Sequence, residues 1–322
     1  MVTFPIILLL LDYWPLERFK NEKTSNLILE KIPFMIFSIL SSIITLIAQK
    51  NSGAVAPMGY IPLIERIKNA LIAYMTYICK MFYPVHLSAF YPNLNAPLWY
   101  AYIAILLIIV IAFISLKYIH TYKYLFFGCC WYFITLIPVI GLVQAGGQVM
   151  ADRYTYIPLI GLFIAVVWSV NEVFINSGLM LRRLIVTITS VLLIACAFLS
   201  WKQVSYWKNN NTLYSHALEI DKRNYVAALM LGNDYLAQGA LDKAIDLYKQ
   251  SVKARPNLLA LNNLGIAYSS KGEYETAIGY FQTALMINRN YSEAHFELAK
   301  TLVKMGRQDD AMRHFILSGH FN

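Results

Sequence analysis

The chain has 322 residues, of which 58% are hydrophobic and 14% charged, and its mean hydropathy is +0.50. A chain this apolar, with its apolar residues gathered in long runs, is not one water-soluble domain. The net charge of +9 arises mainly in short loops between those runs. No helical face collects the basic residues, which argues against nucleic-acid binding. The cysteines lie in apolar stretches without zinc-type spacing, so neither a zinc site nor a disulfide framework is predicted.

The sequence predicts an all-α protein that changes character near residue 203. Residues 1–202 are expected to form a polytopic membrane helix bundle, and residues 203–322 a water-soluble helical repeat domain, a TPR α-solenoid. The opening run has no basic start and no small-residue cleavage site, so it does not resemble a signal peptide. It looks like the second half of a helix whose first half would precede Met1.

Five apolar runs are long enough to cross about 30 Å of hydrocarbon. Each is predicted to be a membrane helix, at residues 32–49, 98–116, 124–143, 155–173 and 183–200.

Residues 64–82 are ambiguous, because charged residues frame a moderately apolar face at helical spacing. If this segment does not cross the membrane, the basic residues of three connections lie on the same side of the membrane, which the positive-inside rule identifies as the cytoplasm. If the segment crosses the membrane, these basic residues no longer share one side. We therefore expect an interfacial or re-entrant helix on the outer face, with the repeat domain also outside. The basic residues in question are Arg18, Lys20, Lys23, Lys31, Lys117, Lys123, Arg182 and Arg183.

The connection between the third and fourth predicted spans carries the strongest functional candidate. Asp152 and Arg153 lie at the lip of a membrane helix, where unpaired charge is costly. Arg153 beside Tyr154 and Tyr156, together with Gln148, is suited to hold a lipid-linked phosphate, because a guanidinium matches phosphate oxygens and tyrosines favour the interface. The alternative is that Asp152 and Arg153 pair with each other and only anchor the helix end.

The almost chargeless outer loop at residues 81–99 contains His86. Its side chain could act as an acid or base near neutral pH, although a hydrogen-bonded structural histidine is the alternative. The sequence has no DxD motif, Gly-rich phosphate loop or metal-ligand cluster. No bound metal or cofactor is therefore predicted, and metal dependence stays open.

The soluble part repeats itself. A leucine followed by a small residue, a large apolar residue, a glycine, an alanine and an aromatic residue recur from Leu231 onward at spacings of 33 and then 34 residues. The leading pair is Leu-Gly in the first two repeats and Leu298-Ala299 in the third. Small residues let paired helices approach and aromatic residues fill the space between them, which is the tetratricopeptide (TPR) pattern. We predict a half-repeat at residues 206–224 and repeats at about 225–257, 258–291 and 292–322.

A TPR array presents its first helices on a concave side that can hold an extended peptide. There Asn233 and Asn262 could hydrogen-bond a peptide backbone, with Phe296 beside it, so a protein partner is predicted. The alternative is that both asparagines are simply solvated.

In chain order, several segments resemble bacterial multispanning TPR proteins related to the animal transmembrane-and-TPR O-mannosyltransferases, which have the GT-C glycosyltransferase fold. The segments are LLLLDYWPLERF at 8–19, SGAVAPMGYIPLIERIKNAL at 52–71, YPVHLSAFYP at 83–92, GQVMADRYTYIPLIGLF at 147–163 and YWKNNNTLYSHAL at 206–218. The resemblance implies transfer of a sugar from a polyprenyl phosphate to a protein hydroxyl on the outer face. It also implies a bacterial inner-membrane location, with the TPR domain periplasmic or extracellular.

One departure from this family concerns catalysis. GT-C enzymes carry their catalytic carboxylate in the first outer loop, and this chain would begin several helices later, as the C-terminal part of such an enzyme. Asp152 is a poor substitute base, because Arg153 beside it should lower its pKa. Enzymatic activity therefore stays open, and a non-catalytic, membrane-anchored TPR scaffold is the main alternative. An O-antigen polymerase or ligase relative would need an outer loop rich in Arg and His, which is not found.

Overall fold

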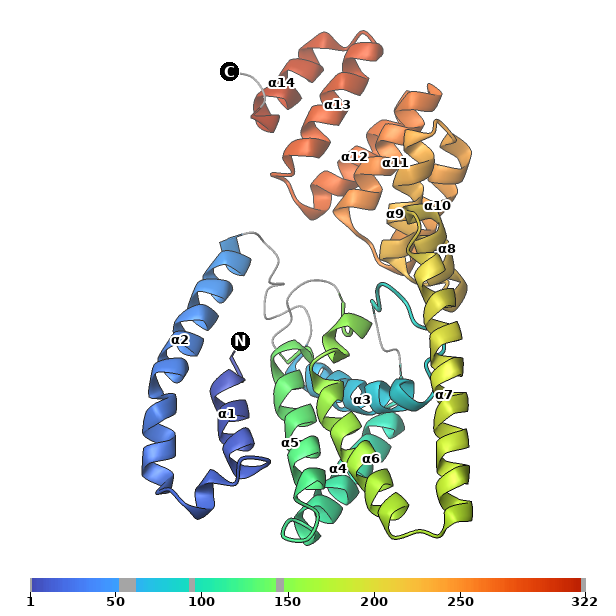
Figure 1. The fold of residues 1–322 in the computed structure, drawn as a ribbon. Helices are drawn as coiled ribbons and strands as arrows, with labels where there is room; N and C mark the ends of the chain where they lie inside the picture. The colour runs from blue at the N-terminus through green and yellow to red at the C-terminus, as the bar shows by residue number, and fades with distance from the viewer. Residues whose placement is uncertain (1, 52–61, 93–95, 143–147, 320–322) are drawn as a thin grey trace. The chain divides into compact units, whose positions relative to one another are not determined.

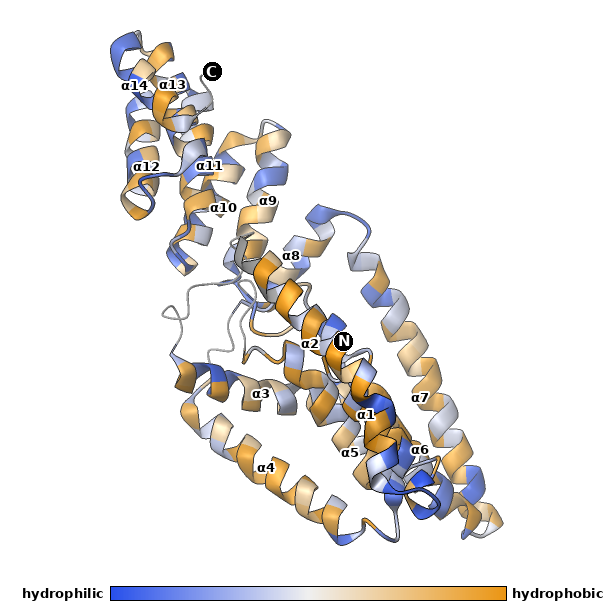
Figure 2. Cartoon of the chain, turned by 90° about the vertical axis from the view of Figure 1, so that its left-hand side faces the viewer, coloured by the Kyte–Doolittle hydropathy of each residue, from blue (hydrophilic) through white to orange (hydrophobic). Residues whose placement is uncertain are grey.

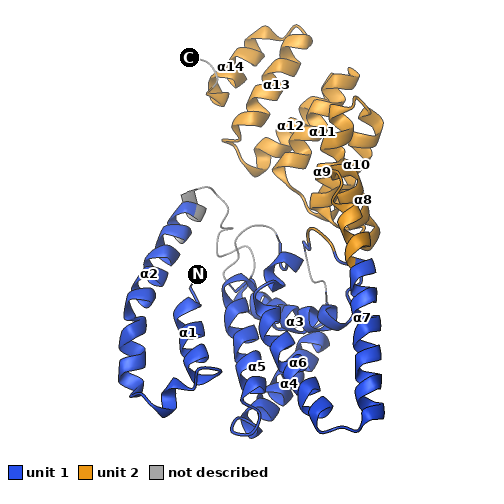
Figure 3. Ribbon diagram, in the orientation of Figure 1, with its two compact units in different colours: residues 1–87, 91–199 blue, residues 88–90, 200–322 orange. Residues whose placement is uncertain are grey.

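The structure is a computed structural model that describes residues 2–51, 62–92, 96–142 and 148–319. Residues 52–61 and 147, which belong to two of the segments quoted above, lie outside the described residues. The chain divides into two compact units (Figure 3). Unit 1 contains Met1–Leu87 and Tyr91–Leu199, and unit 2 contains Ser88–Phe90 and Ser200–Asn322.

Unit 1 is built from helices (Figure 1). Its α-helices in the described ranges are α1 Phe4–Tyr13, α2 Thr24–Asn51, α3 Leu63–Phe82, α4 Leu98–Lys117, α5 Lys123–Leu136, α6 Pro158–Ile175 and α7 Leu179–Tyr206, the last of which continues into unit 2. Short 3-10 turns are η1 Arg18–Lys20, η2 Ile137–Val139 and η3 Asp152–Thr155.

In the part of unit 1 that the structure describes, four helices are long and apolar enough to cross a membrane, namely α2 over Thr24–Thr45, α4, α6 and α7. At most 17% of the most apolar stretch of each is buried, and large side chains such as Phe37 and Ile194 are 69% and 70% exposed. Figure 2 shows α4 as hydrophobic along nearly its whole length. Helices with apolar residues on every side need a lipid or protein environment. The predicted class, a polytopic helix bundle followed by a TPR array, is confirmed.

Two of the predicted spans differ in detail from the observed helices. The run at 124–143 is α-helical only to Leu136 and continues as η2, where Pro138 has no N–H for a helical hydrogen bond. Together α5 and η2 are about 27 Å long, a little less than a hydrocarbon core of about 30 Å. The run at 155–173 begins earlier than α6, because residues 152–155 form the separate turn η3.

The segment predicted at 64–82 forms α3, which is not among the four candidate spans. Its Ala70, Ala73 and Tyr77 are buried in a cluster with Tyr132 and Leu136 of α5. In Figure 1, α3 crosses α5 and α6 rather than running alongside them. Its interfacial placement stays a prediction.

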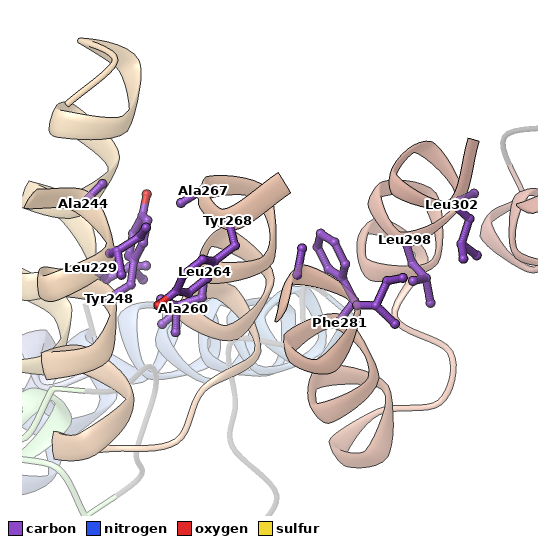
Figure 4. Packing of buried hydrophobic residues seen from close by; sticks show 14 of the residues in the cluster. Leu229, Ala244, Tyr248, Ala260, Leu264, Ala267, Tyr268, Phe281, Leu298 and Leu302 are labelled. Atoms are coloured by element: carbon purple, nitrogen blue, oxygen red, sulfur yellow. The ribbon is translucent and has the colours of Figure 1, made fainter. Parts of the chain in front are cut away.

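Unit 2 consists of antiparallel helix pairs. The helices are α8 Asn210–Ile220, α9 Tyr225–Ala237, α10 Leu241–Ala254, α11 Leu258–Lys271, α12 Tyr274–Ile287, α13 Ser292–Lys304 and α14 Gln308–Ser318. Gly239, Gly272 and Gly306 close the turn of each pair at φ values of 74°, 89° and 78°, a left-handed conformation that glycine adopts without strain. Buried residues from successive pairs form one continuous core (Figure 4).

The small and aromatic positions of the repeat meet inside each helix pair. A Cβ atom on Gly232 would lie 2.6 Å from the Tyr248 ring, and one on Gly265 would lie 2.5 Å from the Phe281 ring. Both rings are completely buried. In these two helix pairs the second helix therefore places an aromatic ring directly on the glycine, where a larger residue would clash.

Candidate functional site

The turn that contains Asp152 and Arg153 is held by α3. The buried Tyr77 hydroxyl donates to the Ala151 carbonyl at 3.1 Å and accepts from the Ala151 amide at 2.9 Å. Tyr77 therefore satisfies both backbone groups of the residue that precedes η3. Burial raises the pKa of Tyr77, so this hydroxyl stays protonated over the physiological range.

Lys80 lies one turn further along α3 and faces the same segment. Its ammonium contacts three acceptors, namely the Asp152 carboxylate at 3.5 Å, the His86 carbonyl at 3.2 Å and the Tyr91 hydroxyl. A lysine ammonium has three N–H donors, so the described neighbours can satisfy all of them. Only 16% of the Lys80 side chain is exposed, and burial lowers its pKa while Asp152 acts in the opposite direction.

Both carboxylate oxygens of Asp152 have a partner. Oδ1 faces Lys80, and Oδ2 accepts from the Tyr91 hydroxyl at 2.8 Å. The predicted alternative in which Asp152 pairs with Arg153 is wrong, because the carboxylate turns toward α3. The carboxylate is instead an anchor for the turn.

Arg153 is exposed, and its guanidinium carbon lies 5.3 Å from the centre of the Tyr154 ring. Gln148 donates its side-chain amide to the Tyr154 hydroxyl. The structure thus brings three of the four predicted lipid-phosphate residues together. Tyr156 is the C-cap residue of η3, and it is 79% exposed. Within the described ranges Arg153 has no carboxylate partner, which leaves its charge available to an external anion.

His86 joins this cluster through its backbone. Its φ of 54° is left-handed, which is uncommon for a residue with a side chain, and its carbonyl accepts from Lys80 and lies 3.1 Å from the Tyr91 hydroxyl. The imidazole is on an exposed residue. The role of His86 as an acid or base stays a prediction. Among the described residues, no group of three or more His, Cys, Asp or Glu side chains could hold a metal ion.

The two asparagines predicted to hold a peptide have different surroundings. Asn233 Oδ1 accepts from the Tyr248 hydroxyl and from the Asn263 amide, both at 2.8 Å, which leaves the Asn233 amide hydrogens as donors. Asn262 is only 5% exposed, and its Oδ1 has no hydrogen-bond partner among the described residues. A buried carbonyl oxygen without a donor is unfavourable. The role of both asparagines in peptide binding stays a prediction.

The third predicted peptide residue, Phe296, lies on α13. Its ring meets that of Phe315 edge to face at 5.8 Å, and the Lys300 ammonium lies 5.3 Å from its centre. Phe296 is half-buried. Its role in peptide binding stays a prediction.

Sequence analysis missed Tyr77, Lys80 and Tyr91 as site residues. Lys80 and Asp152 are 72 positions apart, and no local pattern connects them. The available signal was the spacing of Tyr77 and Lys80, which places both on one face of an amphipathic helix. In the sequence, Lys80 is one of the charged residues that frame the apolar face of that helix.

These features define a helical membrane protein with a TPR array and a cationic turn at one end of its membrane helices. A family model described as "Tetratricopeptide repeat" matches residues 229–295. "Protein O-mannosyl-transferase Tmtc3" of Drosophila melanogaster is 21% identical over 186 residues, which cover 58% of this chain and 16% of that protein. "Protein O-mannosyl-transferase Tmtc2" of the same organism is 23% identical over 125 residues, or 39% of this chain and 13% of that protein. The chain is thus distantly related to these proteins and spans less than a fifth of their length.

Among solved structures, a crystal structure of MamA is similar with a TM-score of 0.33 and 20% identity, covering 37% of this chain and 72% of MamA. The second TPR domain of Spaghetti (RPAP3), bound to an HSP90 peptide, is similar with a TM-score of 0.30 and 21% identity. The match covers 31% of this chain and 95% of that domain.

Proposed function

We propose that this chain forms part of a membrane glycosyltransferase-like protein. In this proposal, the turn at Arg153 holds the phosphate of a polyprenyl-phosphate sugar, and the TPR unit recruits the protein whose hydroxyl accepts the sugar. Both steps take place on the outer face of a bacterial inner membrane. The distant relatives named as O-mannosyl-transferases support the reaction class.

One observation carries the proposed donor site: the carboxylate beside Arg153 is turned away and neutralised by Lys80. A guanidinium paired with its own neighbour would have little attraction left for a phosphate. Because Asp152 is held by α3, Arg153 is exposed with its charge uncompensated, and Tyr154 supports it from one side. Charge-assisted, two-pronged hydrogen bonds to phosphate are the strongest interactions that such a residue offers.

A non-catalytic scaffold is the second candidate function. It is favoured by the engagement of both Asp152 oxygens, since a carboxylate that accepts from Lys80 and Tyr91 is poorly placed to remove a proton from an acceptor hydroxyl. In that case the membrane helices would anchor the chain, and the TPR unit would gather partner proteins. The two candidates differ in whether the Arg153 turn recognises a lipid phosphate.

Binding of a short-chain, detergent-soluble polyprenyl phosphate to the full chain tests the proposal by calorimetry or native mass spectrometry. We expect Arg153→Ala to weaken binding by about tenfold or more, because a charge-assisted contact is lost. Arg183→Ala is the matched control. It removes an exposed arginine near the start of α7, beyond the opposite end of α6, and should bind like the wild type.

The corresponding polyprenyl alcohol provides the second comparison, since it lacks the phosphate. Equal binding of alcohol and phosphate would contradict the proposed donor site, and so would an Arg153→Ala variant with unchanged affinity. A loss of binding of the same size in Arg183→Ala would also contradict it, because the effect would then follow from charge in general.

A further inference from the structure

The site contains a buried cation that the proposed donor contact does not use. Lys80 is more buried than Asp152, with 16% of its side chain exposed against 30% for its partner. Its ammonium lies 4.1 Å from the centre of the Tyr91 ring and contacts acceptors from two other segments, the loop after α3 and the turn η3. A buried charge is tolerated only where it is paired and hydrogen-bonded. The conformations of both segments are therefore coupled to Lys80.

The segments tied by Lys80 also meet through their backbones. The Val149 amide donates to the Tyr91 carbonyl at 3.0 Å, and Tyr91 forms an isolated antiparallel bridge with Met150. Tyr77 fixes Ala151 on the other side. The residues from 149 to 152 are thus bonded in succession to the loop and to α3, and Arg153 is the next residue in the chain.

We infer that Lys80 is a positioning residue: by holding Asp152, it fixes the turn so that Arg153 stays exposed for an anionic headgroup. The inference rests on the proposed function for the identity of the ligand, but the arrangement of the turn can be measured without any ligand. Lys80 itself does not bind the headgroup, because its three donors are already directed at Asp152, Tyr91 and the His86 carbonyl. Loss of the lysine would leave Asp152 uncompensated beside Arg153, which would then attract the guanidinium inward.

Two variants of the full chain in detergent test this inference, with a third as control. Lys80→Met removes the charge and keeps the length of the side chain. Lys80→Met with Asp152→Asn also removes the carboxylate that would capture Arg153. Lys68→Met is the matched control, because Lys68 lies on the same helix with a similar exposure of 19% but pairs, among the described residues, with its neighbour Glu65 and with no part of η3.

The first measurement is binding of the short-chain polyprenyl phosphate. We expect Lys80→Met to weaken it by about tenfold, Lys68→Met to leave it unchanged, and the double variant to recover most of the loss. A direct ligand would behave differently, because the double variant would then bind as weakly as Lys80→Met. That result would overturn the inference, as would unchanged binding in Lys80→Met.

The second measurement is hydrogen-deuterium exchange of peptides that cover residues 149–157, without lipid. The Ala151 amide is bonded to Tyr77 and the Tyr154 amide to the Ala151 carbonyl at 3.0 Å, so both report on the turn. We expect exchange at least about threefold faster in Lys80→Met and unchanged in Lys68→Met. If the wild type does not distinguish phosphate from alcohol, the proposed function fails, while the role of Lys80 stands or falls with this exchange result alone.

Discussion

At the residue scale, we expect a histidine pair in unit 2, formed by the buried His295 and the half-buried His314, to make folding sensitive to pH. His295 Nδ1 lies 2.9 Å from His314 Nδ1, and His295 Nε2 lies 2.9 Å from the Arg289 carbonyl. Because a carbonyl only accepts, His295 carries a proton on Nε2. Between the two Nδ1 atoms only one can carry a proton, since protons on both would place two donors face to face. The pair is therefore incompatible with two protonated rings.

Acid should therefore loosen the hairpin of α13 and α14. Burial, followed by the neighbouring His295, lowers the pKa of His314, and Asp310 acts in the opposite direction. A histidine pKa below its ordinary value of about 6.5 means that the folded state favours the neutral ring. The resulting stability is present above that value and is lost as the pH falls through the lowered folded-state pKa.

Hydrogen-deuterium exchange of α13 and α14 between about pH 8 and pH 5 measures this effect, after correction for intrinsic exchange rates. We expect weaker protection at the acidic end in the wild type. His314→Gln can still donate a hydrogen bond but cannot titrate there, so its pH dependence should be flatter. His120→Gln, an exposed position in unit 1, should retain the wild-type dependence. A wild-type protection that does not change with pH would refute the argument.

The sequence could predict which residue types belong to the candidate site but not how they pair. Arg153, Tyr154 and Gln148 are near one another in the chain, and the structure keeps them together. The partner of Asp152 is Lys80, which lies on α3 and is 72 positions away in the chain. Their contact depends on how α3 packs on α5. The buried state of Asn262 has the same cause, since it depends on how neighbouring helices cover that position.

At the element scale, α5 and α6 approach closely through glycine. A Cβ atom on Gly128 would lie 2.3 Å from the Gly161 carbonyl oxygen and 2.9 Å from the Ala165 Cβ. A Cβ on Gly161 would lie 2.5 Å from the Gly128 carbonyl oxygen. Membrane helices associate through such small residues, because lipid offers no hydrophobic driving force between them.

Gly128→Ala should therefore force the two helices apart. Overpacking of a close contact costs about 1–3 kcal/mol, which should lower the midpoint of thermal unfolding of the chain in detergent. Gly178→Ala is the control: it lies between α6 and α7, and a Cβ atom there meets nothing within 4 Å. If Gly128→Ala melts with the wild type, or if both variants lose the same stability, the close approach of α5 and α6 does not stabilise the bundle.

The two kinds of helix differ in how much of their structure can be predicted from the sequence. The TPR helices follow a repeated pattern of small and aromatic residues, and contacts such as Gly232 with Tyr248 are its direct cause. The membrane helices are recognised by length and hydropathy, which do not reveal where a helix ends. A count of apolar residues therefore extended the third span beyond Leu136, although Pro138 changes the backbone there.

At the scale of the whole molecule, the charges at one end of unit 1 bear on its orientation. The connections from α1 to α2, from α4 to α5 and from α6 to α7 lie at the same end of the unit (Figure 1). Lys123 lies 2.5 Å from Glu17, and Arg18 pairs with Asp12 at 3.2 Å and with Glu30 at 3.0 Å. Several of the basic residues used for the topology prediction thus also hold neighbouring helices together. They still count toward orientation, because acidic residues contribute little to the positive-inside rule.

We therefore expect the end with these three connections to face the cytoplasm. Alkaline phosphatase fused after Trp201 should be active in a bacterial host, because α7 would carry it to the outer face, whereas a fusion after Thr121, in the turn between α4 and α5, should be inactive. A cytoplasmic fluorescent reporter at the same two positions should give the opposite pattern.

Since α3 lies between α2 and α4 in the chain, a membrane-crossing α3 would make α2 and α4 cross in the same direction. The three connections would then no longer all lie on one side of the membrane. An active fusion at Thr121 with an inactive one at Trp201 would place the Arg153 turn on the cytoplasmic side and contradict the use of an outer-face lipid-linked donor.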